Sequence, residues 1–123
     1  GTHDFSAFSN ASRDASVVRD PTRTIYRFDV VELEDGFVRL EVEGNGFLYR
    51  MVRNMVGAIM LAATKKGAGA EDVEAMLAGK DRRVAPRGAP PHGLFLHEVV
   101  YPAALVEWTP PSEDGEASAE NEQ

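Results

Sequence analysis

Two arginines on one predicted helix are the residues of this chain best suited to chemistry. Arg50 and Arg53 stand about one turn apart in an apolar segment, beside Asn54 and Gly57. At about 100° per residue these four fall on one side of a helix and the apolar residues fall on the other. An arginine keeps its charge at any working pH and presents a rigid fork of donors. The pattern predicts a site for an anion that glycine would let approach the backbone, or alternatively a solvated polar face.

A second group of arginines lies in a segment predicted to be a loop. Arg82, Arg83 and Arg87 share residues 81–93 with three prolines and two glycines, residue types that interrupt regular structure. In such a loop an arginine either contacts the phosphates of a nucleic acid or points into solvent. The sequence leaves both interpretations open.

Metal and disulfide chemistry are not expected. The spacing of His3, His92 and His97 is not that of metal ligands, and the chain has no cysteine. The absence of cysteine also suits a reducing compartment.

Charge is distributed unevenly along the chain. The net charge is −7, but residues 104–123 carry six acidic residues and no lysine or arginine, whereas residues 50–87 carry eight basic and four acidic residues. Attraction to a polyanion depends on local charge. A polyanion would therefore meet the basic middle of the chain.

A β-hairpin precedes the helix that carries Arg53. Residues 24–33 are rich in β-branched and aromatic side chains, residues 34–36 indicate a turn, and residues 37–43 alternate apolar with charged side chains. The first strand changes phase at Val30 and Val31, which predicts a β-bulge there or burial of both faces.

Two helices and a third strand follow the hairpin. The pattern predicts helices over residues 47–64 and 70–78, a loop over residues 81–93, and a strand over residues 94–101 that is apolar on both faces and so interior to a sheet. The order β-β-α-α-β predicts an α+β fold, a largely antiparallel sheet with helices packed on one face. One edge of such a sheet would need a partner.

The chain is predicted to form one domain with a tail. Its 123 residues suit a single domain, which we assign to residues 1–103. Residues 104–123 are predicted to be an acidic disordered tail. No apolar run approaches the length of a membrane span.

Three segments together resemble the A-type tRNA pseudouridine synthases. They are residues 1–8 (GTHDFSAF), residues 44–57 (GNGFLYRMVRNMVG) and residues 89–96 (APPHGLFL), the last followed by VVY at residues 99–101. Their order and spacing are also similar to those of the family. The resemblance implies the C-terminal half of a family member, with half of a pseudouridine synthase fold.

The resemblance implies a chemistry that this chain does not complete alone. Family members isomerise uridine to pseudouridine in the anticodon stem-loop of tRNA, without a metal or organic cofactor. Their nucleophilic aspartate lies in the N-terminal half, in a motif that this sequence lacks. We therefore expect a truncated product or excised domain, inactive alone, whose partners are tRNA, the missing N-terminal half and, in a homodimer, a second copy. The resemblance also implies a cytoplasmic protein that binds tRNA through its basic loop.

By its place in the match, Arg53 would be the arginine that pairs with the catalytic aspartate. A carboxylate in a closed pocket needs a cationic partner to remain ionised and aimed. The alternative is an arginine that braces the hairpin through Glu41 or Glu43.

The resemblance also implies roles around Arg53. Arg50 would contact a phosphate or hold the loop, Asn54 would fix nearby backbone, and Gly57 would permit close packing of the helix. Leu94 and Leu96 match apolar residues near the uracil, and membership of the core is the alternative for both. Substrate binding is thus expected at Arg50, Asn54, Leu94 and Leu96.

Two classes of function follow from the sequence. The first is the half of a tRNA-modifying isomerase that supplies Arg53. The second is a non-catalytic RNA-binding or assembly module that keeps the scaffold without the nucleophile. A soluble α+β domain with a basic groove is a third interpretation. Pseudouridine formation by the purified chain alone would contradict the first.

Overall fold

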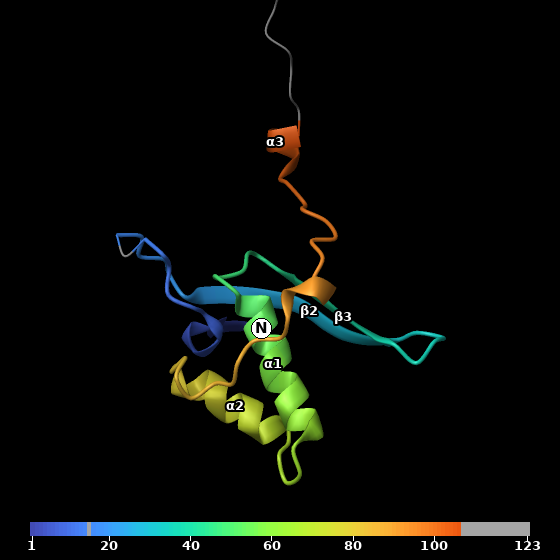
Figure 1. Cartoon of the computed structure of the whole chain (residues 1–123). Helices are drawn as coiled ribbons and strands as arrows, with labels where there is room; N and C mark the ends of the chain where they lie inside the picture. Colours follow the sequence, from blue (N-terminus) through green and yellow to red (C-terminus); the bar gives the residue numbers. More distant parts are fainter. Residues whose placement is uncertain (15, 107–123) are drawn as a thin grey trace, which may run out of the picture.

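The computed structural model, which describes residues 1–14 and 16–106, has an α+β fold (Figure 1). Its elements are β1 (Thr2–Asp4), the 3₁₀ helix η1 (Ser6–Phe8), β2 (Thr22–Glu32), β3 (Val38–Gly44), α1 (Met51–Thr64), α2 (Ala70–Gly79), the 3₁₀ helix η2 (Pro91–Gly93) and α3 (Ala103–Val106). The strands form an antiparallel sheet in the order β1-β2-β3, and α1 and α2 pack against one face of it. The predicted fold class is confirmed.

The hairpin of β2 and β3 is confirmed, and β2 is the central strand of the sheet. Leu33 N donates to Phe37 O at 2.8 Å to close the turn, in which Gly36 has φ 77°. β1 pairs with β2 through Thr2 opposite Thr24. The sequence did not indicate β1, because three polar residues without alternation carry no strand signal.

One irregularity in β2 decides which side chains face the helices. The register shifts between Ile25 and Arg27, whereas pairing is regular at Val30, which lies opposite Leu40. The extra residue lets Ile25 and Phe28 both pack against the core. The prediction of a bulge at Val30 and Val31 is therefore wrong, and Val30 is exposed rather than buried.

The core lies where η1, the start of α1 and the sheet meet. Its buried residues are Phe5, Ala7, Phe8, Leu48, Met51, Met55 and Ala58. α2 packs against this cluster through Val73, Met76 and Leu77. The position of α1 is thus fixed by its buried face, and its other face is left to support a site.

The first turn of the predicted long helix is not helical. α1 begins at Met51 rather than at Phe47, because Arg50 has a left-handed backbone with φ 59°, which a continuous right-handed helix excludes. Met51 N instead donates to Leu48 O at 3.0 Å. α1 ends at Thr64 as predicted, and α2 extends one residue past the predicted Ala78.

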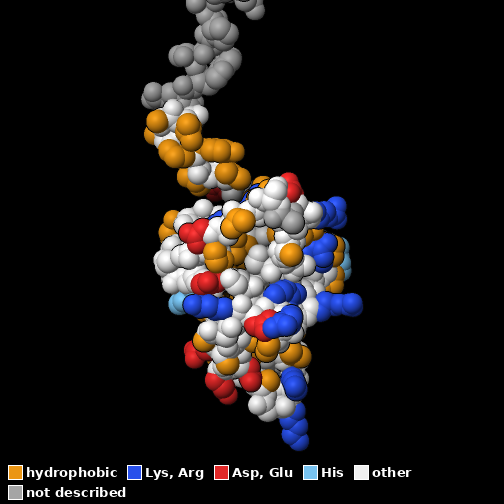
Figure 2. All heavy atoms as spheres, turned by 90° about the vertical axis from the view of Figure 1, so that its left-hand side faces the viewer, with side chains coloured by type: hydrophobic (Ala, Val, Ile, Leu, Met, Phe, Trp, Pro, Cys, Tyr) orange, Lys and Arg blue, Asp and Glu red, His pale blue; other side chains and the backbone are white. Residues whose placement is uncertain are grey.

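The predicted third strand over residues 94–101 is wrong for the part of the chain that the structure describes. These residues have no regular secondary structure and lie in no sheet. Leu96 and Phe95 are each 81% exposed, and the segment stands away from the body with hydrophobic side chains along it (Figure 2). A strand needs a neighbouring edge, and within the described residues no strand lies beside this segment.

The predicted tail falls largely outside the described residues, since the structure describes the chain only as far as residue 106. No helix within the described ranges is long and apolar enough to cross a membrane.

Candidate active site

A Gly-rich turn fixes where α1 starts. Asn45 bonds twice to Thr24 of β2: its N donates to Thr24 O at 3.0 Å, and its Oδ1 accepts from Thr24 N at 2.9 Å. A Cβ at Gly44 would lie 2.7 Å from the same carbonyl oxygen, so this position tolerates only glycine. The turn therefore ties the arginine-bearing helix to the sheet.

Arg53 is held from one side, and within the described residues only the Nε of its guanidinium group has a hydrogen-bond partner. Its Nε donates to Ala89 O at 2.8 Å, and its own carbonyl accepts from Ala89 N at 2.9 Å. The residue is half-buried. Within the described residues Arg53 joins no ion pair. A neutral carbonyl therefore orients the cation without neutralising it.

Gly57 lets the segment that carries Ala89 cross α1. A Cβ at Gly57 would lie 2.3 Å from Arg87 O and 3.1 Å from Gly88 Cα. Both atoms belong to the backbone, which cannot rotate away as a side chain would. The close packing expected at Gly57 is thus with the segment of residues 87–89, and it sets the distance from which Ala89 O reaches Arg53.

Asn54 lies inside the molecule rather than on the polar side of α1. It is only 2% exposed, and its Nδ2 donates to Phe8 O at 2.8 Å and to Asn10 Oδ1 at 2.9 Å. A buried amide needs such partners to offset its lost hydration. Asn54 therefore fixes nearby backbone, and the structure places its side chain away from solvent.

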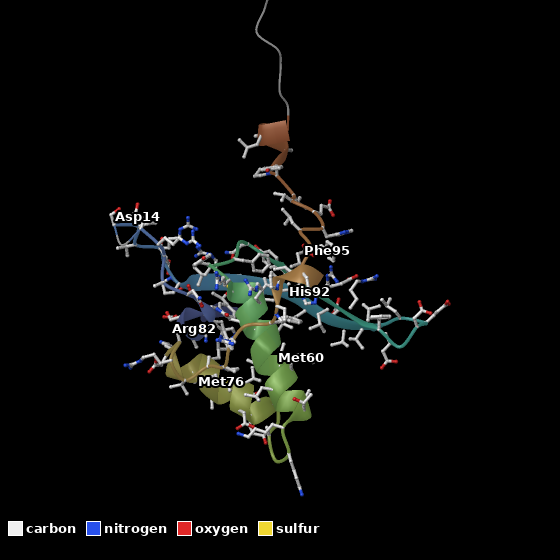
Figure 3. All side chains as sticks on the ribbon, in the orientation of Figure 1. Asp14, Met60, Met76, Arg82, His92 and Phe95 are labelled. Carbon is white, nitrogen blue, oxygen red and sulfur yellow. The ribbon has the colours of Figure 1, made fainter. Side chains whose placement is uncertain are left out.

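Arg82 occupies the same interior network. Its donors reach Asn10, Asn54 and the carbonyls of Ala85 and Pro86, and Figure 3 shows the side chain turned toward the N-terminal part of the chain. The residue is half-buried. It comes from the predicted basic loop but differs from Arg83 and Arg87, both of which are exposed.

Arg83 and Arg87 differ in their partners. Arg83 forms an ion pair with Asp81, with Nη2 at 3.0 Å from Oδ2, and this pair lowers the pKa of the Asp81 carboxyl through the hydrogen bond from Arg83. The Arg83 side chain is nevertheless 89% exposed, so the pair is screened by solvent. Among the described residues, Arg87 joins no ion pair.

Arg50 and Tyr49 form an exposed pair at the start of α1. The Arg50 guanidinium carbon lies 5.2 Å from the centre of the Tyr49 ring, which is within the range of a cation–π contact. The charge of Arg50, with a smaller contribution from Arg13, lowers the pKa of the Tyr49 hydroxyl. Two cations and a phenol therefore gather here, from the turn before α1 and from the loop over residues 9–20.

Leu94 and Leu96 are not part of the core. They are 48% and 81% exposed, and their segment begins directly after η2, which follows the carbonyl that holds Arg53. The alternative of core membership is wrong for both. Their predicted place near a uracil stays a prediction.

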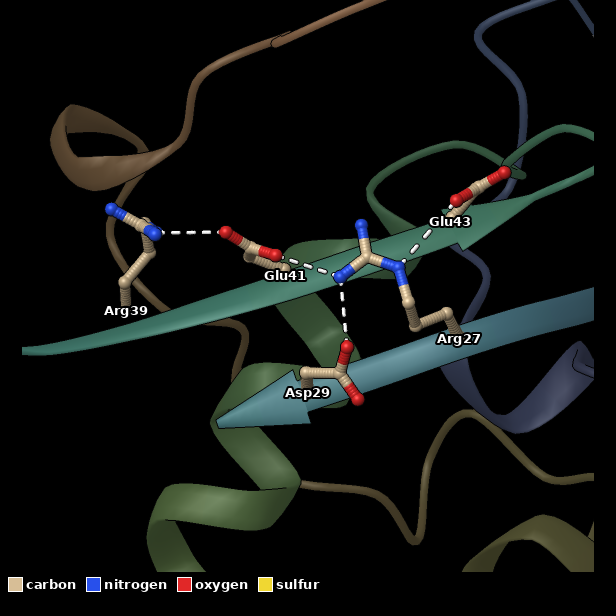
Figure 4. A network of polar contacts seen from close by, with 5 residues as sticks. All are labelled: Arg27, Asp29, Arg39, Glu41 and Glu43. Carbon is tan, nitrogen blue, oxygen red and sulfur yellow. Dashed lines mark hydrogen bonds and ion pairs between the residues drawn. The ribbon is translucent and has the colours of Figure 1, made fainter. Parts of the chain in front are cut away.

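The alternative role for Arg53, bracing the hairpin, is wrong. The outer face of the hairpin has its own arginines: Arg27 pairs with Asp29, Glu41 and Glu43, and Arg39 pairs with Glu41 (Figure 4). Hydrogen bonds from Arg27 lower the pKa of the Glu41 carboxyl. Glu41 and Glu43, the carboxylates in question, are therefore already paired.

An apolar cavity lies elsewhere. A cavity of about 520 Å³ is lined by Phe28 of β2, Met55 and Ile59 of α1, and Val73 and Leu77 of α2, among others. On a helix Met55 and Ile59 face away from Arg53 and Gly57. The cavity is a gap in the packing between helices and sheet, with no arginine in its lining. Within the described residues no cluster of histidine and acidic residues could hold a metal ion.

Sequence reasoning missed Asn10 and the carbonyl of Ala89. Asn10 Oδ1 accepts from both Asn54 and Arg82, and Ala89 contributes only backbone atoms. A lone asparagine in a predicted loop gives no sign of a role in a site. A backbone carbonyl is present at every residue, so the sequence cannot single one out. Only the approach of distant segments brings these groups together.

The comparisons with known proteins agree on one family. A family model described as tRNA pseudouridine synthase matches residues 1–102. The chain is 48% identical over 101 residues to tRNA pseudouridine synthase A 1 of Protochlamydia amoebophila, a match that covers 82% of this chain and 39% of that protein. It is 49% identical over 102 residues to tRNA pseudouridine synthase A of Chlamydia trachomatis serovar L2b, covering 83% and 36%. It is 46% identical to the Bacillus velezensis protein of the same name, covering 82% and 39%. The chain thus spans less than two fifths of the length of these relatives.

Proposed function

The chain belongs to the tRNA pseudouridine synthase family, and from that premise we propose that it forms the C-terminal half of a tRNA uridine-to-pseudouridine isomerase. In this role Arg53 pairs with a catalytic aspartate that lies outside this chain. The observation that carries the proposal is the state of the Arg53 guanidinium. It is oriented by a neutral carbonyl at 2.8 Å and has no carboxylate partner among the described residues.

The reaction requires a carboxylate to stay charged beside a nucleobase. The bond between C1′ of the ribose and N1 of the uracil breaks, the base turns, and a bond between C1′ and C5 forms. C5 loses a proton and N1 gains one, so no oxidant or reductant is needed. An aspartate that acts as nucleophile or base must be ionised, and a nearby cation lowers the pKa of a buried carboxyl. Arg53 supplies that cation.

The proposed substrate is the anticodon stem-loop of tRNA, whose target uridine must leave its stack to be reached. Arg50, Arg83 and Arg87 are exposed and are proposed to contact phosphates, because arginine forks match phosphate oxygens. Leu94 and Leu96 are proposed to line the place of the uracil, since both are exposed and follow the segment that holds Arg53.

The proposed partners are the rest of the enzyme and a second copy in a homodimer. Two features support an interface. The segment over residues 94–101 exposes Phe95, Val100 and Tyr101 by 60% or more. β3 also has an open edge in the part of the chain that the structure describes. Exposed apolar segments and open sheet edges are commonly covered by a partner. The reaction is proposed to need no cofactor, and the protein to act in the cytoplasm.

The experiment grafts residues 1–102 of this chain in place of the matching segment of the Bacillus velezensis relative. Activity is read as release of tritium from C5 of labelled uridine in tRNA, because the isomerisation removes that hydrogen. We expect the graft to be active and Arg53→Ala to lower kcat by at least about 100-fold, the cost of losing one charged group aimed at the reaction. Arg53→Lys should restore only part of the rate, because lysine lacks the planar fork.

A matched control is Arg39→Gln, which removes an arginine from the outer face of the hairpin and should leave kcat unchanged. A folded Arg53→Ala graft that retains full activity would overturn the role of Arg53. Pseudouridine formation by the 123-residue chain alone would overturn the proposal that it is only half of the enzyme. An active relative that loses activity in every graft, while the graft still binds tRNA, would favour a non-catalytic RNA-binding module.

A further inference from the structure

Arg82 engages nearly all of its donors within the molecule. Its Nε donates to Asn10 Oδ1 at 3.0 Å and its Nη2 donates to Asn54 Oδ1 at 3.1 Å. Its Nη1 donates to Pro86 O at 3.0 Å and to Ala85 O at 3.2 Å. A guanidinium group has five N–H donors, so four are used on neutral oxygens. Arg82 could reach a phosphate only by giving up these bonds.

Both sets of bonds lead to Arg53. On one side Arg82 holds Asn54, the residue next to Arg53 in α1. On the other side it holds the carbonyls of Ala85 and Pro86, from which the chain continues to Ala89, whose carbonyl accepts from Arg53 Nε. The two paths also meet directly, because a Cβ at Gly88 would lie 2.6 Å from Asn54 Oδ1. Arg82 thus fixes α1 and the segment that crosses it as one unit.

We propose that Arg82 is a positioning residue for Arg53. It clamps the segment of residues 85–89 onto α1 and so sets the direction in which Ala89 O holds the Arg53 guanidinium. The functional part of the inference rests on the proposed role of Arg53, whereas its structural part does not. It differs from the sequence-based prediction that Arg82, like Arg83 and Arg87, binds RNA.

The structural part is tested on the chain itself by NMR. The Nε–Hε group of Arg53 gives a signal that is assigned by its loss in Arg53→Lys. In Arg82→Ala we expect this proton to exchange with water at least about tenfold faster, because the hydrogen bond to Ala89 O is no longer held in place. Arg39→Ala is the matched control and should leave the signal unchanged. A folded Arg82→Ala chain with an unchanged Arg53 signal would overturn the proposal.

Two further variants guard against simple unfolding. In Arg82→Lys the new side chain can donate to the carbonyls of Ala85 and Pro86 but has no fork to reach Asn10 and Asn54 as well. This variant should therefore speed the exchange of the Arg53 Hε proton less than Arg82→Ala does. Added guanidinium ion should bind the space left in Arg82→Ala and restore slow exchange, whereas an equal concentration of sodium should not. Failure of both rescues would show loss of folding rather than of positioning, and would count against the proposal.

The functional part is tested in the graft described above. Arg82→Lys should lower kcat more than it raises KM for tRNA, because substrate contacts remain and only the orientation of Arg53 is disturbed. If Arg82 instead binds phosphate, KM should rise and its dependence on salt should weaken, with the Arg53 signal intact. An active Arg53→Ala graft defeats the proposed function but leaves the NMR result untouched, so the two failures are distinguishable.

Discussion

Two clusters of arginines in this molecule differ in what accepts their hydrogen bonds. On the outer face of the hairpin, Arg27 lies 2.7–3.5 Å from three carboxylates. On the inner side, Arg53 and Arg82 donate only to carbonyl and amide oxygens among the described residues. Carboxylates neutralise an arginine and neutral oxygens only orient it. The first arrangement suits a stable surface, and the second leaves the charge of both arginines unneutralised within the described residues.

The acid–base behaviour of the two clusters follows from this difference. Hydrogen bonds to Asp29 and Glu41 raise the pKa of Arg27 above its ordinary value. In return, Arg27 lowers the pKa of the Glu41 carboxyl. Arg53 would lower the pKa of its proposed aspartate partner in the same way, because within the described residues Arg53 pairs with no other carboxylate. Positive charge near a site is therefore better judged by the acceptors of each arginine than by a count of arginines.

The largest expected effect comes from breaking the inner cluster at Gly57. In Gly57→Ala the new Cβ would stand 2.3 Å from Arg87 O, and such overpacking costs about 1–3 kcal/mol in the free energy of unfolding. Alanine gains about 1 kcal/mol in helix propensity over glycine, which is too little to offset displacement of a backbone segment. We expect a lower free energy of unfolding in urea and a faster exchange of the Arg53 Hε proton.

Gly79→Ala is the control for this change, because nothing lies within 4 Å of a Cβ there. This variant should keep or slightly raise stability. If Gly57→Ala were as stable as Gly79→Ala and left the Arg53 signal in place, the close crossing of α1 would not be what holds the inner cluster.

A smaller effect is expected from the outer cluster. Arg27→Gln removes an arginine whose side chain is 43% exposed, and exposed ion pairs contribute little to stability. The decrease in the free energy of unfolding should be smaller than for Gly57→Ala. It should become smaller still as salt is added, because salt screens exposed charges. Urea unfolding at low and high ionic strength measures both. A large, salt-independent loss would mean that the outer network holds the fold as firmly as the inner one.

The sequence predicts the elements of this fold better than it predicts their contacts. Alternation over residues 37–43 gave the hairpin, and helical spacing gave α1 and α2. The sequence-based prediction failed at residues 94–101. Apolar residues on both faces indicate a buried strand, but the pattern cannot show whether a neighbouring strand is present to pair with it, and none lies there among the described residues. It also placed Asn54 on the polar side, because an average over a helix cannot show that one amide is satisfied by Phe8 O from 46 residues away.

The candidate site divides in the same way. Arg53 and Gly57 could be singled out from their spacing, and the resemblance of residues 44–57 to a family strengthened that choice. The inward role of Arg82 could not, because Arg82 and Arg83 are identical neighbours in the sequence and only the fold turns one toward Asn54 and the other toward Asp81. A common role therefore cannot be assigned from the sequence alone to residues of one type in one loop.

The smallest effect is expected at Asp4, a carboxylate whose hydrogen-bond donors are neutral groups. It is the acidic counterpart of Arg53 and Arg82, which donate to neutral oxygens. Asp4 Oδ1 accepts from Ser6 Oγ and Ser6 N, and the hydroxyl bond is the main cause that lowers the pKa of Asp4 from 3.8. A carboxyl whose pKa is lower in the folded state stabilises the fold above its unfolded pKa and loses that contribution as the pH falls through its folded pKa. The free energy of unfolding should therefore decline below about pH 4.

Ser6→Ala should raise the pKa of Asp4 and weaken this decline, as followed by NMR titration of the carboxyl carbon. Ser16→Ala, which removes the equivalent bond to Asp14 in the loop, should leave the Asp4 titration unchanged. An Asp4 pKa that ignores the loss of the Ser6 hydroxyl would show that neutral partners do not tune charged groups in this fold, and the contrast between the two arginine clusters would lose its physical basis.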